Sequence, residues 1–180
     1  MKKLLFLLFI SKILAQSNVA FDLSNSFISY DGKHPAHSWT GISKQIEGKF
    51  ILNEEDFTKS TVELFVPMFS FDSKNSNRDS NMLDVVEEYF YPYVSFKSKN
   101  IEITDEGFNV IGDISFHGIT KEFSIPITKN IEDNKIIIDS LFSIYLTDFK
   151  IKRPALLTIK IRDRVDLEFH LEGLVEKIKQ

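Results

Sequence analysis

Apolar and polar residues alternate along most of this chain. In the clearest run, residues 165–172, every second side chain is apolar and each one between is charged or polar. The same two-residue period recurs at 62–68, 94–98, 108–116, 123–127 and 136–146. Because successive side chains of a β-strand point to opposite faces, this pattern is typical of strands with one buried face. The chain is therefore predicted to be an all-β protein.

Turn-forming residues separate the predicted strands. Asp105-Glu106-Gly107 and Asp133-Asn134 are predicted hairpin turns, and His117-Gly118 indicates another reversal. Short strands at regular spacing, with no internal repeat and no linker, predict one domain with antiparallel strands, a barrel or a sandwich. The 180 residues are enough for a substantial core.

Two segments depart from the alternation. Residues 80–88 have helical spacing of apolar side chains, and Asp79 or Ser80 is the predicted cap of this short helix. Pro126 stands inside the apolar run at 123–127. Because proline cannot donate to a strand ladder, it indicates a sheet edge or a bulge.

The first fifteen residues have the pattern of a secretory signal. Lys2 and Lys3 precede the apolar stretch 4–10, and Ile13-Leu14-Ala15 is a suitable cleavage site. The alternative is a membrane anchor, but this apolar run is much shorter than the ~20 residues that a spanning helix needs. We expect residues 1–15 to be a signal peptide and residues 16–180 to be the mature domain.

Net charge and amino-acid composition narrow the range of binding partners and cellular locations that we expect. The formal net charge is −4, and removal of Lys2, Lys3 and Lys12 with the signal peptide lowers it by three, to −7. Such a surface attracts phosphate backbones poorly, so no nucleic-acid partner is expected. The absence of cysteine excludes disulfides, thiolate metal sites and a lipidated cysteine anchor. The expected protein is periplasmic or secreted, with no stable membrane anchor.

Several segments, taken in order, resemble the YceI-like family of polyisoprenoid-binding, lipocalin-like barrels of the bacterial envelope. They are His34 to Gly41, Ser70 to Asp79 with Tyr91 to Ser98, Gly112 to Lys121, Asp148-Phe149 and Val165 to Leu171. One departure is Asn81, which stands where many relatives have histidine. The resemblance implies an antiparallel lipocalin-like barrel of about eight strands, with one short helix in the linker near residues 80–88. It also implies non-catalytic binding or carriage of an isoprenoid lipid or quinone, and it leaves a homodimer open.

Phenylalanine is abundant, with 17 in the chain. Rings at alternate barrel positions either line an apolar slot or fill the core, because an eight-stranded barrel supports both. The resemblance favours a cavity. The residues expected to line it are apolar side chains on the inward rows: Val62, Leu64, Val66, Val94, Phe96, Phe108, Val110, Ile114, Phe116, Phe142, Ile144, Leu167 and Phe169.

Four polar residues are candidates for the barrel mouth: Arg78, Asp79, His37 and His117. In one interpretation, Arg78 meets a ligand head group such as a quinone carbonyl or a phosphate. In the other, which we favour, Arg78 ties the linker to the sheet and Asp79 caps the helix. His37 and His117, with His34, would make a three-imidazole zinc set, but Pro35 argues against a helix that presents two of them together. No metal site is expected.

No pattern of catalytic residues stands out. The chain has no Gly-x-Ser-x-Gly elbow and no phosphate-binding glycine loop. Carboxylates fall mostly on outward strand positions, where solvation is the default. We therefore expect no enzyme activity and no cofactor. The alternative function is a filled barrel that acts through its surface as an envelope interaction or stress module, with Phe65 and Tyr145 as outer contact positions.

Overall fold

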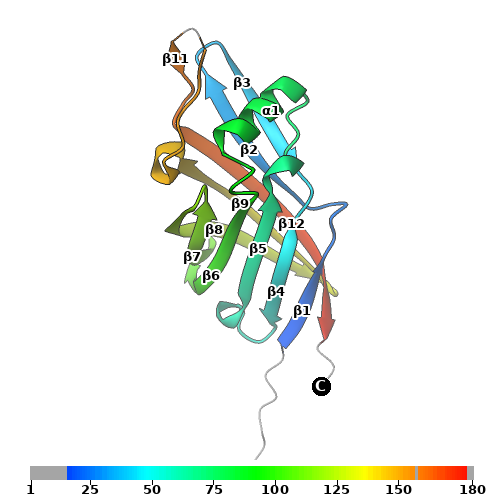
Figure 1. Ribbon diagram of the computed structural model, residues 1–180. Helices are drawn as coiled ribbons and strands as arrows, with labels where there is room; N and C mark the ends of the chain where they lie inside the picture. Colours follow the sequence, from blue (N-terminus) through cyan, green and yellow to red (C-terminus); the bar gives the residue numbers. More distant parts are fainter. Residues whose placement is uncertain (1–15, 157, 178–180) are drawn as a thin grey trace, which may run out of the picture.

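The computed structural model describes residues 16–156 and 158–177, so the expected signal peptide lies outside the described residues. The barrel strands are β1 (Gln16–Phe21), β4 (Glu47–Asn53), β5 (Thr61–Pro67), β6 (Tyr93–Thr104), β7 (Gly107–Phe116), β8 (Ile119–Glu132), β9 (Lys135–Tyr145) and β12 (Arg164–Lys177). These eight strands pair antiparallel in that order, and β12 pairs back with β1 to close the ring (Figure 1). The predicted antiparallel, eight-stranded, lipocalin-like barrel is confirmed.

Four strands and three short 3-10 helices lie outside the ring. They are β2 (Phe27–His34), β3 (His37–Ser43), β10 (Ala155–Leu156), β11 (Ile159–Lys160), η1 (Phe57–Lys59), η2 (Met68–Ser70) and η3 (Leu146–Phe149). Strand β12 pairs with β1 along its C-terminal part and with β2 at 166–170. The β2–β3 hairpin therefore extends the wall at one end of the barrel, beside α1 (Figure 1).

Among the described residues there is one α-helix, α1 (Ser76–Val85), and it begins four residues before the predicted segment 80–88. Asn75 is its cap, because the Asn75 side chain accepts the Arg78 backbone N–H at 3.0 Å. The prediction that Asp79 or Ser80 caps the helix is wrong. Asparagine is as good a cap as aspartate or serine, and the sequence offers several cap residues in succession here.

The β-hairpin turns follow the sequence closely. Asp105-Glu106, His117-Gly118 and Asp133-Asn134 connect β6 to β7, β7 to β8 and β8 to β9. Pro126 lies at a free strand edge, as predicted, because β8 pairs with β9 only at 128–132 and with β7 over 119–127. The ring of Phe149 in η3 is fully buried and stacks on Phe123, at 6.0 Å between ring centroids. Phe123 lies in the part of β8 that does not pair with β9.

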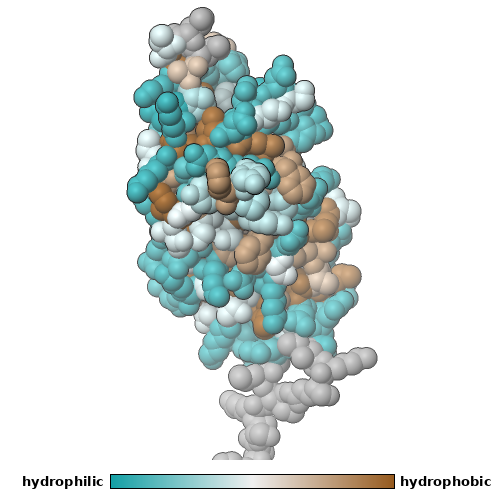
Figure 2. All heavy atoms as spheres, in the orientation of Figure 1, coloured by the Kyte–Doolittle hydropathy of each residue, from teal (hydrophilic) through white to brown (hydrophobic). Residues whose placement is uncertain are grey.

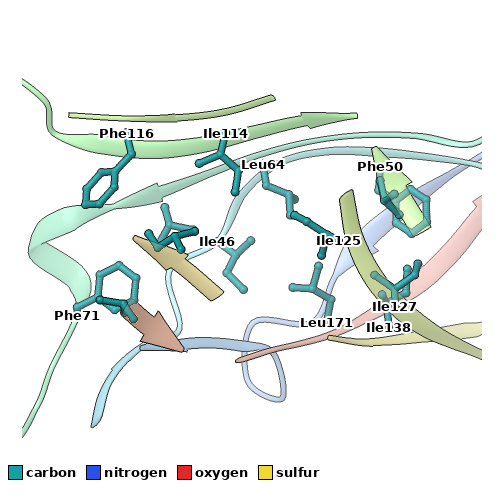
Figure 3. Packing of buried hydrophobic residues seen from close by; sticks show 14 of the residues in the cluster. Ile46, Phe50, Leu64, Phe71, Ile114, Phe116, Ile125, Ile127, Ile138 and Leu171 are labelled. Carbon is teal, nitrogen blue, oxygen red and sulfur yellow. The ribbon is translucent and has the colours of Figure 1, made fainter. Parts of the chain in front are cut away.

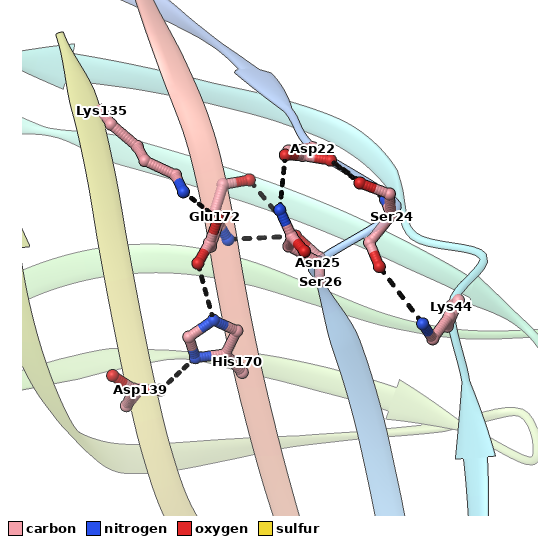
Figure 4. A network of polar contacts seen from close by, with 9 residues as sticks. All are labelled: Asp22, Ser24, Asn25, Ser26, Lys44, Lys135, Asp139, His170 and Glu172. Carbon is pink, nitrogen blue, oxygen red and sulfur yellow. Dashed lines mark hydrogen bonds and ion pairs between the residues drawn. The ribbon is translucent and has the colours of Figure 1, made fainter.

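A polar network joins neighbouring strands on the outside of the barrel (Figure 4). His170 on β12 contacts Asp139 on β9 through Nδ1 at 2.5 Å and Glu172 through Nε2 at 3.3 Å. Lys135 pairs with Glu172. Buried Ser26 accepts the Glu172 backbone N–H at 3.0 Å, which ties the turn between β1 and β2 to β12.

Replacing His170 with glutamine is expected to cost stability mainly in acid. The hydrogen bond with Asp139, with Glu172 on the other side, raises the pKa of His170. The stability that the His170 imidazolium contributes is therefore complete below the pKa of this histidine in the unfolded chain. It is lost as the pH rises through the pKa of His170 in the folded protein. Urea unfolding should show a loss of about 0.5 kcal/mol at about pH 5.5 and a smaller one at about pH 9, the size typical of exposed pairs. Equal losses at both pH values would contradict this assignment.

Candidate ligand-binding cavity

The barrel encloses a cavity of about 600 Å³. Its walls are mostly aliphatic and aromatic side chains from β2, the ring strands other than β1, and α1. Figure 3 shows part of this lining, with Leu64 and Ile114 on one side and Ile125 and Leu171 on the other. The volume lies within the range of roughly 300–1,000 Å³ that is typical of small-molecule sites.

The cavity is elongated along the strands. Val165, Leu167, Phe169 and Leu171 of β12 all line it. Because strands rise about 3.3 Å per residue, these six steps cover roughly 20 Å. The cavity therefore has the shape of a slot that suits an extended apolar chain.

The middle of the barrel is hollow. Val62, Val94, Phe96 and Leu167 point into the cavity, yet each is only partly buried. An inward side chain of a close-packed core would be fully enclosed by its neighbours. The interior therefore does not match the filled barrel that was the alternative from sequence.

The structure places twelve of the thirteen predicted lining residues around this cavity. Phe108 is the exception. It lies at the start of β7, beside the turn after β6, where its ring meets Phe57 at 4.8 Å and the Lys129 ammonium sits 5.5 Å from the ring centroid. Alternation assigned Phe108 to the inward row but carries no information about how far along the barrel the void extends. The role of the other twelve in ligand binding stays a prediction.

Some lining residues were not predicted. Met82, Val85 and Val86 reach the cavity from α1 and the turn after it, and Ile125 and Ile138 reach it from β8 and β9. The helical spacing of Met82, Val85 and Val86 was visible in the sequence. It did not show which surface the helix covers, because that depends on how the chain crosses the barrel end.

The cavity opens between β3, α1 and the β10–β11 hairpin, and we call this end the mouth. Most of the exposed lining residues lie here, among them His37, Asn81 and Pro154. The β10–β11 hairpin is held against β2, because His34 Nε2 lies 3.2 Å from the Ile159 carbonyl oxygen and the Arg162 N–H donates to the Lys33 carbonyl at 2.7 Å.

Two aromatic rings of the mouth lie flat on glycines. Tyr30 is paired across the strands with Gly41, and Trp39 with Gly32. A Cβ atom at Gly41 would lie 2.3 Å from the Tyr30 ring, and one at Gly32 would lie 2.3 Å from the Trp39 ring. The glycines therefore allow both rings to press against the hairpin and line the cavity wall. Trp39 is therefore part of the cavity wall.

Arg78 and Asp79 both hold Ser73, in the loop before α1. Arg78 donates from Nε to the Ser73 hydroxyl at 2.8 Å and from Nη2 to its carbonyl at 2.9 Å. The Asp79 carboxylate accepts the Ser73 N–H at 3.2 Å. Arg78 also lines the mouth, 5.5 Å from the Trp39 ring centroid, whereas Asp79 does not line the cavity. Both residues therefore stabilise the loop before α1, but Asp79 does not cap the helix and Arg78 bonds to this loop instead of to a strand. Of the two, only Arg78 lines the cavity.

His117 is wrongly assigned to the mouth by the sequence. It lies on the β7–β8 turn, with Nε2 3.2 Å from Glu87 and Nδ1 2.9 Å from the Phe149 carbonyl oxygen. His37 does line the mouth, with its ring 5.4 Å from Trp39 and 5.5 Å from His34. Across residues 16–156 and 158–177, no three histidine, aspartate or glutamate side chains come close enough to hold a metal ion.

Replacing Asp79 with alanine is expected to lower the free energy of unfolding by about 2 kcal/mol. The change leaves the N–H and the hydroxyl of buried Ser73 without their charged acceptor, and hydrogen bonds to charged groups contribute about 1.5–3 kcal/mol each. Urea unfolding measures the loss. Because Asp79 lies outside the cavity, the affinity of the folded variant for an apolar probe should stay unchanged, and a large loss of affinity would contradict this placement.

Comparisons with known proteins agree with the fold. A family model described as the YceI-like domain matches residues 19–173. UPF0312 protein plu2095 of Photorhabdus laumondii is 29% identical over 127 residues, which are 68% of this chain and 63% of that protein. Protein YceI of Escherichia coli is 26% identical over 118 residues, 64% of this chain and 62% of that protein. The matches thus span about 62–63% of the length of these curated relatives.

Two solved structures share the architecture. BcnA of Burkholderia cenocepacia superposes with a TM-score of 0.78 at 20% identity, over 84% of this chain and 98% of that chain. A polyisoprenoid binding domain from Saccharophagus degradans gives a TM-score of 0.67 at 14% identity, over 91% and 99%. None of the described helices has the length and apolarity to cross a bilayer. The family match covers most of the described residues, and the chain belongs to the YceI-like family.

Proposed function

We propose that this protein binds one isoprenoid lipid, with the apolar tail inside the barrel, and so shields it from water. The observation that carries this proposal is the elongated apolar cavity of about 600 Å³. Membership of the YceI-like family and the likeness to a polyisoprenoid binding domain of Saccharophagus degradans support it.

The chemistry of the cavity suits carriage better than catalysis. Moving an apolar chain from water into such a site is favourable by about 25 cal/mol per Å² of buried apolar surface, and no bond has to form or break. Polar lining residues gather at the mouth, as Arg78, Asn75 and Asn81 do, while the body of the slot is apolar. The proposed protein is therefore a carrier or store, without enzyme activity and without a cofactor.

The proposed setting is the bacterial envelope, in the periplasm or outside the cell. The signal-like pattern of residues 1–15 supports this setting. In an aqueous compartment the apolar tail of a long isoprenoid or a quinone has to be shielded from water, and the interior of a closed barrel provides this shielding.

Native mass spectrometry of the protein purified from bacterial envelopes tests the proposal. The expected spectrum contains a complex with one lipid, and organic extraction should release an isoprenoid of defined mass. The purified apo protein should also take up geranylgeraniol added from detergent. A protein that carries no lipid and takes up no added isoprenoid would contradict the proposal and favour a function of the outer surface.

On the face of the molecule that Figure 2 shows, hydrophilic residues predominate and apolar side chains lie among them. Phe65 and Tyr145 are exposed, as the sequence predicted. Scattered exposed apolar residues are normal on soluble proteins, so these two positions do not by themselves indicate a partner.

A further inference from the structure

The β10–β11 hairpin and the residues beside it form a basic segment on an otherwise acidic protein. The formal charge of residues 150–164 is +5, because they include Asp163 and six basic residues: Lys150, Lys152, Arg153, Lys160, Arg162 and Arg164. The whole chain carries −4, so all its other residues together carry −9. Exposed charges are screened beyond about 8 Å at physiological ionic strength. A partner at the hairpin therefore meets the local positive charge and not the net negative charge.

The carboxylates near this segment do not neutralise all its cations. At the base of the hairpin, Arg162 and Arg164 share Asp166, at N···O distances of 3.7 and 2.7 Å. On the two arms, Lys152 and Lys160 are exposed, and neither makes an ion pair with any carboxylate of the described residues. These two ammonium groups are therefore available to an anionic partner.

The tip of the hairpin is uncharged. Residues 154–159 contain no acidic or basic side chain. Ala155 is exposed, and so is Ile159, at 50%. An exposed apolar tip flanked by basic residues suits the interface of a bilayer with anionic lipids, where apolar side chains enter the acyl boundary and cations meet the head groups. An acidic protein or a nucleic acid would use the cations but not the apolar tip.

The hairpin projects beside the mouth, at the end of the barrel opposite to the start of β1 and the end of β12 (Figure 1). Its arms are tied together, because Arg153 donates from Nε and Nη2 to the Ile161 carbonyl at 2.9 and 2.7 Å. Pro154, Ala155 and Ile161 line the cavity. A surface that meets the tip of the hairpin is therefore next to the opening of the cavity.

We propose that the β10–β11 hairpin is a membrane-docking element, which binds the surface of a bilayer that contains anionic phospholipids and places the mouth against it. Lys152 and Lys160 meet the lipid phosphates, and Ile159 enters the interface. The contact is peripheral and reversible, because a few cations and one short apolar tip bind far more weakly than a membrane span. This inference goes beyond the proposed function: it concerns where the barrel meets the membrane and does not depend on which ligand the barrel holds.

Sedimentation with vesicles tests the docking. One set of vesicles contains phosphatidylcholine alone, and the other contains equal parts of phosphatidylcholine and phosphatidylglycerol. At low salt the partition coefficient of the natural protein should be at least about tenfold higher for the mixed vesicles, because each lysine near an anionic surface contributes about fivefold. High salt should remove most of this difference.

Substitutions in the hairpin separate its charge from its apolar tip. The double variant Lys152→Gln/Lys160→Gln should lower the partition coefficient for mixed vesicles about tenfold or more. Lys49→Gln/Lys177→Gln is the matched control, because it removes the same charge from exposed lysines on β4 and β12, and it should change binding less than about threefold. Ile159→Ser should weaken vesicle binding about fivefold and leave binding to soluble polyaspartate unchanged. All these variants should keep the melting temperature, since the side chains are exposed.

Trp39 reports the orientation of the docked protein. It is the one tryptophan of the chain, is partly exposed and lines the mouth. Mixed vesicles should shield it from acrylamide and shift its emission to shorter wavelength, whereas the hairpin lysine variant should show neither effect at the same lipid concentration. Vesicle binding that leaves Trp39 equally accessible would mean that another face docks, and it would overturn the proposal.

The other outcomes also decide. Equal binding to both kinds of vesicle, or equal binding by the natural protein and the hairpin lysine variant, overturns the docking element. Binding to polyaspartate as strong as binding to mixed vesicles, with no effect of Ile159→Ser on either, would indicate an acidic protein partner and overturn it too. The vesicles contain no isoprenoid, so this test is independent of the proposed function. A protein that docks but takes up no geranylgeraniol keeps the docking element and loses the carrier function.

Discussion

Replacing Leu167 with tryptophan is expected to abolish most apolar-ligand binding while the barrel stays folded. Leu167 lies on β12 between Phe142 of β9 and Tyr30 of β2, and it faces the void. The larger indole would occupy space that the tail needs. If it removes about 100 Å² of apolar contact, the loss is about 2.5 kcal/mol, roughly fiftyfold in affinity.

Leu174→Trp is the control for this substitution. Leu174 lies on the same strand but is 47% exposed, so an indole there does not enter the cavity. Titration of both variants with geranylgeraniol, with urea unfolding alongside, measures the two effects. Unimpaired binding by folded Leu167→Trp would show that the tail lies elsewhere.

Replacing Phe149 with alanine is expected to have the largest effect on stability. The Phe149 ring is fully buried, packs on Phe116 at 5.5 Å and stacks on Phe123. It fills the gap where β8 and β9 no longer pair. Large-to-small changes of this kind cost about 3–5 kcal/mol, because the lost contacts and the remaining cavity both destabilise the fold.

Urea unfolding of Phe149→Ala and Phe90→Ala measures this contribution. Phe90 is 71% exposed, and surface substitutions usually change stability by less than about 0.5 kcal/mol. A loss below about 1 kcal/mol for Phe149→Ala would mean that η3 is not part of the closed wall, and the contact between η3 and β8 would have to be revised.

Local sequence patterns predicted most of the strands and turns of the barrel. The strict alternation at 165–171 and 108–116 predicted β12 and β7, and the short polar pairs Asp133-Asn134 and His117-Gly118 marked the turns. These signals are local, because a strand with one buried face has a period of two and a hairpin turn needs residues that tolerate a positive φ. The pairing of β12 with both β1 and β2 joins distant segments, and no local pattern predicts it.

The site was only partly predictable for the same reason. Inward rows follow from alternation, so Val66, Ile114 and Phe142 were assigned to the interior. The extent of the void depends on which aromatic rings pack together. Alternation therefore could not show that Phe108 packs on Phe57 instead of lining the cavity. The exposed mouth is formed by β3, α1 and the β10–β11 hairpin, which lie far apart along the chain. The sequence therefore assigned Arg78 and His37 to the mouth but not Asn75 and Asn81.

The proposed function requires that an isoprenoid tail lie inside the barrel. Intermolecular nuclear Overhauser effects between geranylgeraniol and the methyl groups of the labelled protein test it most directly. We expect contacts from the tail to Val66, Ile114 and Leu167, which line the cavity, and none to Leu141 or Leu174 on the outside. Contacts confined to the outer methyl groups, or a ligand that binds without contacting the cavity methyls, would contradict it.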